Sequence, residues 1–178
     1  MVQVKSENKK KIGILGGTFD PAHKGHIKIS KEAKKRFGIE KIIWAITKKN
    51  PYKNKSSLSL KERIKYAKEI NLKNKFIKVN FYENIIKSNR TIDLIRYFKK
   101  KNKNAEIYFI MGADNLINFH KWKNSRLISS ICNILVFDRK GYKAKSLKSL
   151  SFKKYSKKGL EFIKFKKVNI SSSQLRKI

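Results

Sequence analysis

A run of residues near the N-terminus has the types and spacing that could handle phosphate. From Gly16 to His26 it reads Gly-Gly-Thr-Phe-Asp-Pro-Ala-His-Lys-Gly-His. Without side chains, Gly16 and Gly17 let backbone N–H groups come close to an anion. His23 and His26 lie three residues apart, where a helix is expected to begin. Imidazoles at a helix N-terminus can donate hydrogen bonds to phosphate oxygens as negative charge builds up in a transition state.

Other interpretations of the two histidines are a helix cap, a surface pair or a metal site. The only other histidine is His120, and Asp20 is the only acid near the pair. The single cysteine, Cys132, excludes an intramolecular disulfide and a cysteine-based zinc site. The glycine spacing fits neither G-x-G-x-x-G nor a Walker loop. We therefore predict a phosphate site without protein ligands to a metal.

Short apolar runs that alternate with helical patterns must position this motif. We expect buried strands at 12–15, 42–46, 76–79, 106–111, 131–137 and 162–165. We expect helices at about 25–37, after the Ser59–Glu62 capping box to about 70, and from Thr91 as a cap through 100. The alternation predicts an α/β fold, with a Rossmann-like, doubly wound parallel sheet covered by helices on both faces. The motif then lies at the carboxyl end of the sheet, where such folds bind ligands.

The charge of the chain is extreme, with 46 Lys+Arg against 12 Asp+Glu, or +34 over 178 residues. Only seven of the cations are arginines, whereas base-edge recognition favours arginine. We interpret most of the charge as compositional background, with a polyanion partner as the alternative. The 40% of apolar residues is enough for a core. We predict a disordered basic N-terminus (1–10), one domain (11–178) and a mobile basic loop (139–160).

A nucleic-acid-binding module is the competing functional class. Residues 139–158 carry nine Lys/Arg and no acid, and Tyr142, Phe152 and Tyr155 could stack on bases. This hypothesis leaves the histidine motif unexplained. The N-terminus has no apolar signal segment, and no apolar run approaches the ~20 residues of a membrane span. We therefore expect a cytoplasmic protein.

With these residues the chain resembles the nucleotidyltransferase superfamily, whose signature is G-G-T-F-D-P-x-H-x-G-H, and more closely the bacterial nicotinate-nucleotide adenylyltransferases. Further segments that match family patterns in order are Trp44–Lys53, Arg90–Asp93, Ile110–Trp122 and Ile170–Arg176. The resemblance implies the nucleotidyltransferase form of the α/β fold. It also implies transfer of AMP from ATP to nicotinate mononucleotide, which yields nicotinate adenine dinucleotide and pyrophosphate in NAD biosynthesis. Mg²⁺, held mainly by the ATP phosphates, is the implied cofactor.

The resemblance also implies roles for single residues. The implied catalytic residues are His23, His26 and Arg176. The implied ATP-binding residues are Gly16, Gly17, Thr18, Phe19, His23, His26, Gly112, Asp114, Ser171, Ser172 and Arg176. The implied mononucleotide-binding residues are Lys53, Thr91 and Trp122, the last by stacking on the pyridine ring. Simpler alternatives are core packing for Trp122, a solvated side chain for Lys53, helix caps for Thr91 and Asp114, and a frayed terminus for Arg176.

One departure concerns the C-terminus. Family members continue into a helical segment, whereas two residues follow Arg176 here. We expect weaker anchoring of Arg176, with lower ATP affinity or help from a partner chain. ATP and nicotinate mononucleotide are the expected partners, with a homo-oligomer left open and neither a membrane nor nucleic acid expected. The amide mononucleotide and phosphopantetheine are alternative acceptors.

Overall fold

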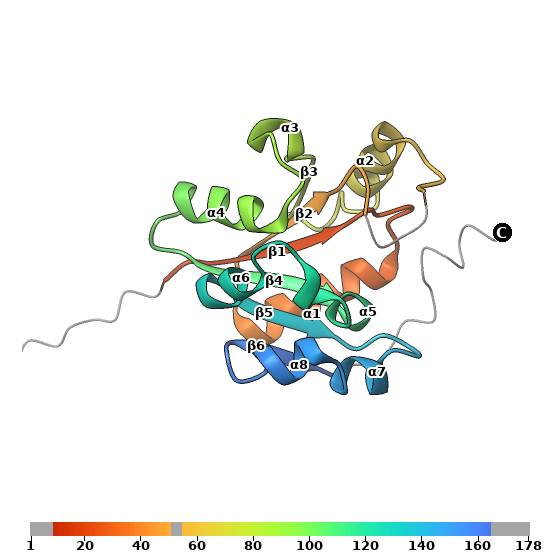
Figure 1. Ribbon diagram of the computed structural model, residues 1–178. Coiled ribbons are helices and arrows are strands. Elements are labelled where there is room, and N and C mark those ends of the chain that lie inside the picture. The colour runs from red at the N-terminus through yellow and green to blue at the C-terminus, as the bar shows by residue number, and fades with distance from the viewer. Residues whose placement is uncertain (1–8, 51–54, 165–178) are drawn as a thin grey trace, which may run out of the picture.

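A parallel sheet of six strands forms the centre of the computed structural model, which describes residues 9–50 and 55–164 (Figure 1). The strands are β1 (Lys11–Gly17), β2 (Lys41–Ile46), β3 (Ile77–Asn80), β4 (Glu106–Gly112), β5 (Asn133–Phe137) and β6 (Leu160–Ile163). Their order is β3-β2-β1-β4-β5-β6, and every neighbouring pair is parallel. The predicted doubly wound sheet is therefore confirmed. The winding reverses between β1 and β4, and their carboxyl ends flank the expected ligand crevice.

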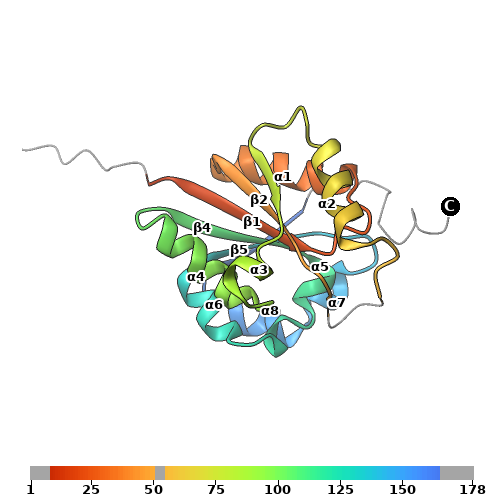
Figure 2. The same cartoon turned by 90° about the horizontal axis from the view of Figure 1, so that it is seen from above.

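Helices cover both faces of this sheet (Figure 2). They are α1 (Lys24–Phe37), α2 (Leu60–Glu69), α3 (Glu83–Ile86), α4 (Thr91–Lys101), α5 (Ala113–Leu116), η1 (Phe119–Lys121), α6 (Ser125–Ile131), α7 (Lys143–Leu147) and α8 (Leu150–Tyr155). Side chains of α1 and α2 pack in one core, whereas those of α4, α5, α6 and α8 pack in the other. Within the two described ranges, no helix has the length and apolar character to span a membrane.

Alternation along the strands sends side chains into both cores. On β1, Ile12 and Ile14 join one core and Leu15 joins the other, as a strand buried on both faces requires. Trp44 on β2 is fully buried, and its indole N–H donates to Ser30 Oγ at 2.8 Å. Trp44 is therefore a structural residue.

Several local predictions are also confirmed. Helix α1 ends before Gly38, whose φ of 65° places it in the left-handed region that glycine favours. The capping box of Ser59 and Glu62 starts α2. Cys132 is buried. One expectation fails at the boundary of β5, because Ile131 ends α6 and the strand begins at Asn133.

The expectation of a loop over 139–160 is wrong. The segment contains α7 and α8, and Ser146, Ser151 and Tyr155 are fully buried. Serine fits there because its hydroxyl is satisfied locally, as Ser146 Oγ donates to the Lys143 carbonyl at 2.9 Å. The absence of an apolar periodicity hid these short helices.

The same packing removes one support for nucleic-acid binding. The Tyr155 hydroxyl lies 2.8 Å from Ser125 Oγ in the interior, and its ring packs edge-to-face on Phe119. A base cannot stack on a ring with no exposed surface.

Candidate active site

His23 and His26 cap helix α1 reciprocally. His23 is the N-cap residue, and its Nδ1 accepts a hydrogen bond from the Gly25 N–H at 3.1 Å. In return, the His23 N–H donates to Nδ1 of His26 at 3.1 Å. The capping alternative from the sequence is thus confirmed, and it bears directly on the chemistry of the two rings.

The reciprocal cap selects one tautomer for both histidines. A ring nitrogen that accepts from a backbone N–H carries no proton, so the ring proton of a neutral imidazole sits on Nε2. Each ring therefore offers Nε2–H as its donor, on the side opposite the bond that caps the helix. An arrangement of two Nε2–H donors at a helix N-terminus suits an anion.

Buried aromatic rings hold the pair in place. The His23 and His26 ring centroids are 4.0 Å apart, and Phe19 lies 4.7 Å from His26. Phe19 is almost fully buried and stacks on Trp44 at 4.9 Å. The side chain of Phe19 is therefore a support for His26, so any contact of this residue with ATP must come from its backbone.

Burial lowers the pKa of His23 to about 4, with a further contribution from the charge of Arg139. His23 is thus neutral at pH 7 and keeps its Nδ1 lone pair for the cap. Protonation would place a second N–H against the Gly25 N–H and break this bond.

Replacing His23 by Asn should make the free energy of unfolding fall less steeply as the pH is lowered. Because the folded pKa lies below the usual 6.5, the unfolded chain binds the proton more readily. The stabilisation that neutral His23 gives the folded chain is complete above pH 6.5 and is lost as the pH falls toward 4. Asn still caps the helix but does not titrate. Urea unfolding between pH 7.5 and 4 measures how the free energy of unfolding of each variant depends on pH. His120→Asn is the control. A pH dependence of His23→Asn parallel to that of wild type would contradict the prediction.

The turn after β1 brings backbone groups close to the histidine pair. Gly16, Gly17 and Thr18 are partly exposed, and the Gly17 carbonyl accepts from the Thr47 N–H at 2.9 Å. This bond joins the turn to the end of β2. The glycines thus lie at the carboxyl edge of the sheet, as predicted from the motif.

The end of β4 contributes Gly112 and Asp114. A Cβ on Gly112 would lie 2.6 Å from Asp114 Oδ1, so a larger residue at this position would displace the carboxylate of Asp114. Gly112 is the N-cap of α5, which rules out the alternative of Asp114 as the cap. Instead, Asp114 Oδ2 accepts from Arg139 Nη1 at 2.6 Å.

Arg139 is a site residue that the sequence reasoning missed. It follows β5 at the carboxyl edge of the sheet, pairs with Asp114 and lowers the pKa of His23 through its charge. Its guanidinium also lies 5.7 Å from the ring centroid of Tyr142. Its position just after the predicted strand 131–137 could have indicated a site residue, because the other site residues also follow strands. The expectation of a loop over 139–160 concealed this indication.

Trp122 is half-buried beyond α5. It packs edge-to-face on Phe109 at 6.0 Å and on Phe119 at 5.4 Å. Core packing therefore accounts for part of its surface, and the remainder stays available to a flat ring. His120 is bound to α8, since its N–H donates to Ser151 Oγ at 2.8 Å.

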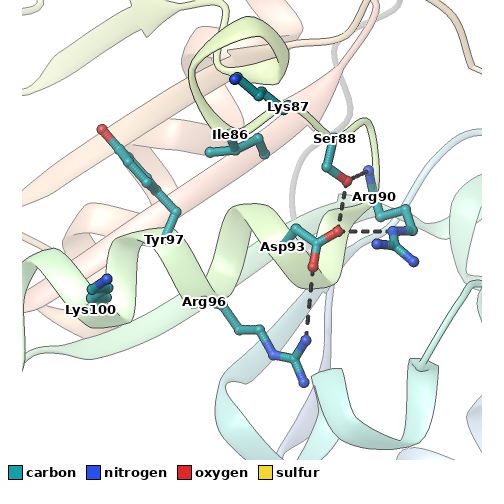
Figure 3. Close-up of a pocket in the computed structure, with 8 residues that line it drawn as sticks. All are labelled: Ile86, Lys87, Ser88, Arg90, Asp93, Arg96, Tyr97 and Lys100. Carbon is teal, nitrogen blue, oxygen red and sulfur yellow. Dashed lines mark hydrogen bonds and ion pairs between the residues drawn. The ribbon is translucent and has the colours of Figure 1, made fainter.

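An open pocket of about 440 Å³ is lined by residues of α3, of α4 and of the turn between them, among them Ser88, Arg90 and Asp93 (Figure 3). In it, Ser88 Oγ donates to Asp93 Oδ2 at 2.6 Å and Arg90 Nε donates to the same oxygen at 2.9 Å. These bonds, that of Ser88 foremost, lower the pKa of Asp93. The alternative of Thr91 as the cap is wrong, because Arg90 holds that position and Thr91 is the first helical residue.

Four predicted site residues lie outside the described residues. They are Lys53, Ser171, Ser172 and Arg176. Of the other predicted residues, those of the first motif lie at the carboxyl end of β1 and the start of α1, and Gly112 and Asp114 lie at the end of β4 and the start of α5. Thr91 is the first residue of α4, and Trp122 directly follows η1.

Comparisons with known proteins agree with this geometry. Residues 14–178 match the cytidylyltransferase-like family model. A protein of Pelagibacter ubique named "Probable nicotinate-nucleotide adenylyltransferase" is 66% identical over 173 residues, or 97% of this chain and 96% of its own length. A Ruegeria protein of the same name is 35% identical over 82% of this chain and 76% of its own length.

A solved structure shares the fold. The nicotinic acid mononucleotide adenylyltransferase of Plasmodium falciparum, complexed with NaAD, superposes with a TM-score of 0.74 at 22% identity, covering 94% of this chain and 83% of that one. With the matched family model and the relatives of high identity, the chain belongs to the nicotinate-nucleotide adenylyltransferases of the cytidylyltransferase-like family.

Proposed function

We propose that this chain transfers AMP from ATP to the 5′-phosphate of nicotinate mononucleotide, releasing pyrophosphate and forming nicotinate adenine dinucleotide. The observation that carries this proposal is the capped histidine pair at the carboxyl edge of the sheet. The Pelagibacter relative with 66% identity bears the name of this activity.

The chemistry of this transfer calls for hydrogen-bond donors and needs no general base. The phosphate oxygen of the mononucleotide attacks the α-phosphorus, and the bond to the pyrophosphate oxygen breaks. The attacking oxygen is already ionised, so no proton has to be removed. The main obstacle is the negative charge that gathers around phosphorus, and positioned donors stabilise it.

The described residues suit these roles. The Nε2–H of His26 would donate to the α-phosphate and that of His23 to the phosphate chain, with backbone donors from Gly17 and Thr18. Asp114 would meet the adenosine, and the open surface of Trp122 would stack on the pyridine ring. Lys53, Thr91, Ser171, Ser172 and Arg176 stay as assigned from the resemblance.

Mg²⁺ would enter with ATP and neutralise part of the leaving pyrophosphate. Among residues 9–50 and 55–164, no three His, Cys, Asp or Glu side chains gather as a possible metal site. That the ion is bound mainly by the ATP phosphates is what the resemblance implies.

A comparison of acceptors tests the proposal. Pyrophosphate release is measured with ATP and, in turn, nicotinate mononucleotide, its amide and phosphopantetheine. We expect the acid to be preferred over the amide by about 10–100-fold in kcat/KM, since a hydrogen bond to a charged group contributes about 1.5–3 kcal/mol. A strong preference for the amide, or activity with phosphopantetheine alone, would overturn the assignment.

A further inference from the structure

Arg63 on α2 is almost fully buried at 2% exposure, which sets it apart from the solvated cations of this chain. Among the described residues, its guanidinium donates to backbone carbonyls alone. Nη1 reaches the Thr18 carbonyl at 2.7 Å and the Thr47 carbonyl at 2.8 Å. Nη2 reaches Lys48 and Nε reaches Leu58, each at 3.2 Å.

These four carbonyls belong to three separate parts of the chain. Thr18 lies in the turn beside the histidine pair, Thr47 and Lys48 follow β2, and Leu58 precedes α2. One side chain therefore sets the spacing between the turn after β1 and both described ends of the segment between β2 and α2.

Asp20, from the same motif as the histidines, supports this arrangement. Its two carboxylate oxygens accept from the backbone N–H groups of Ser57 at 2.7 Å and Leu58 at 3.0 Å. On the other side, Glu83 accepts from the Lys48 N–H at 3.1 Å. The charges of Asp20 and Glu83 oppose the lowering of the Arg63 pKa by burial, so the guanidinium keeps its charge.

We propose that Arg63 is a positioning residue for the transfer reaction, which holds the phosphate-binding turn at Thr18 in register with the segment ends at Thr47, Lys48 and Leu58. This inference rests on the proposed function. The proposed role requires no phosphate contact of Arg63, because four of its five N–H donors are used on carbonyls. Its effect is on the relative placement of two loops that flank the reacting groups, and a shift of about 1 Å there can cost about 100-fold in rate.

Arginine is needed because the carbonyls lie in different directions. The planar guanidinium presents its N–H groups as a rigid fork, whereas an ammonium offers a compact charge at one point. Lysine would keep the charge but could not reach all four carbonyls at once.

Steady-state kinetics of Arg63→Lys test the proposal at a temperature where circular dichroism shows the variant folded. We expect kcat to fall by about 10–100-fold while the KM for ATP stays within about threefold. In Arg63→Ala, added guanidinium ion at a non-denaturing concentration should restore several-fold activity, whereas equal NaCl should not.

Asn71→Ala is the matched control. Asn71 is buried just after the same helix and donates to the Ala67 carbonyl at 2.9 Å, with no bond to either loop. It should lose stability with unchanged kcat. Wild-type kcat in Arg63→Lys, beside an active wild type, would overturn the positioning role alone. A wild type that releases no pyrophosphate would overturn the proposed function itself.

Discussion

Replacing His26 by Ala should lower turnover by about 100–1,000-fold. In the in-line displacement the Nε2–H of His26 donates to an oxygen whose negative charge grows in the transition state, and loss of one such donor has an effect of this size. The change also removes one of the two bonds of the reciprocal helix cap, because Nδ1 of His26 accepts the His23 N–H. It should therefore also reduce the free energy of unfolding by about 1 kcal/mol.

His26→Gln separates these two consequences. A glutamine at this third helical position can still accept the N–H of the capping residue, but it lacks the imidazole Nε2–H. We expect near wild-type stability together with a loss of turnover of at least about 100-fold. Pyrophosphate release and urea unfolding measure the two effects on the same samples.

His120→Ala is the control for loss of a histidine outside the site, since His120 is bonded to Ser151. It should retain turnover. Activity of His26→Gln within a few-fold of wild type would refute the role of His26 as a donor, whatever its stability.

Replacing Arg139 by Met should lower kcat/KM by about 10–100-fold. The substitution leaves the carboxylate of Asp114, whose side chain is only 11% exposed, without its guanidinium partner. Breaking such a pair costs more than the pair contributes, because the remaining charge stays partly desolvated. It also removes a positive charge near the phosphate site.

A double-mutant cycle with Asp114→Asn measures the coupling between the two residues. We expect a coupling energy in kcat/KM of about 1–3 kcal/mol, as for residues in direct contact. Arg126→Met, at an exposed position on α6, is the matched control and should leave kcat/KM unchanged. Strictly additive effects of Arg139→Met and Asp114→Asn would contradict the pairing.

The pH profile provides a second readout for Arg139. Its charge contributes to the low pKa of His23, behind burial as the larger cause. Arg139→Met should therefore raise this pKa part of the way toward 6.5, and activity should decline at a higher pH during acidification. An unchanged acidic limb would show that Arg139 does not act on His23.

The parallel sheet was predictable because its central strands β1, β2, β4 and β5 are buried on both faces and therefore form nearly continuous apolar runs. In β5, for example, the apolar run that contains Val136 predicts a buried strand without knowledge of the neighbouring strands. Helices with a clear start, such as α2 after Ser59, were equally accessible. The short helices α7 and α8 were not, because their buried Ser146 and Ser151 are residues that usually indicate exposure.

By itself the sequence determined the fold class, the phosphate motif and the family pattern, because these depend on local spacing that survives without knowledge of contacts. The resemblance assigned Lys53 and Arg176 to the site, whereas only the tertiary structure distinguished Arg139 and Arg63 from the other cations among the 46 Lys+Arg. Arg139 meets Asp114 across 25 positions, and Arg63 meets Thr18 across 45. The first pair forms only when β4 and β5 lie side by side in the sheet, and the second only when α2 lies beside the turn after β1. Neither residue type nor spacing distinguishes these two arginines from solvated cations beforehand.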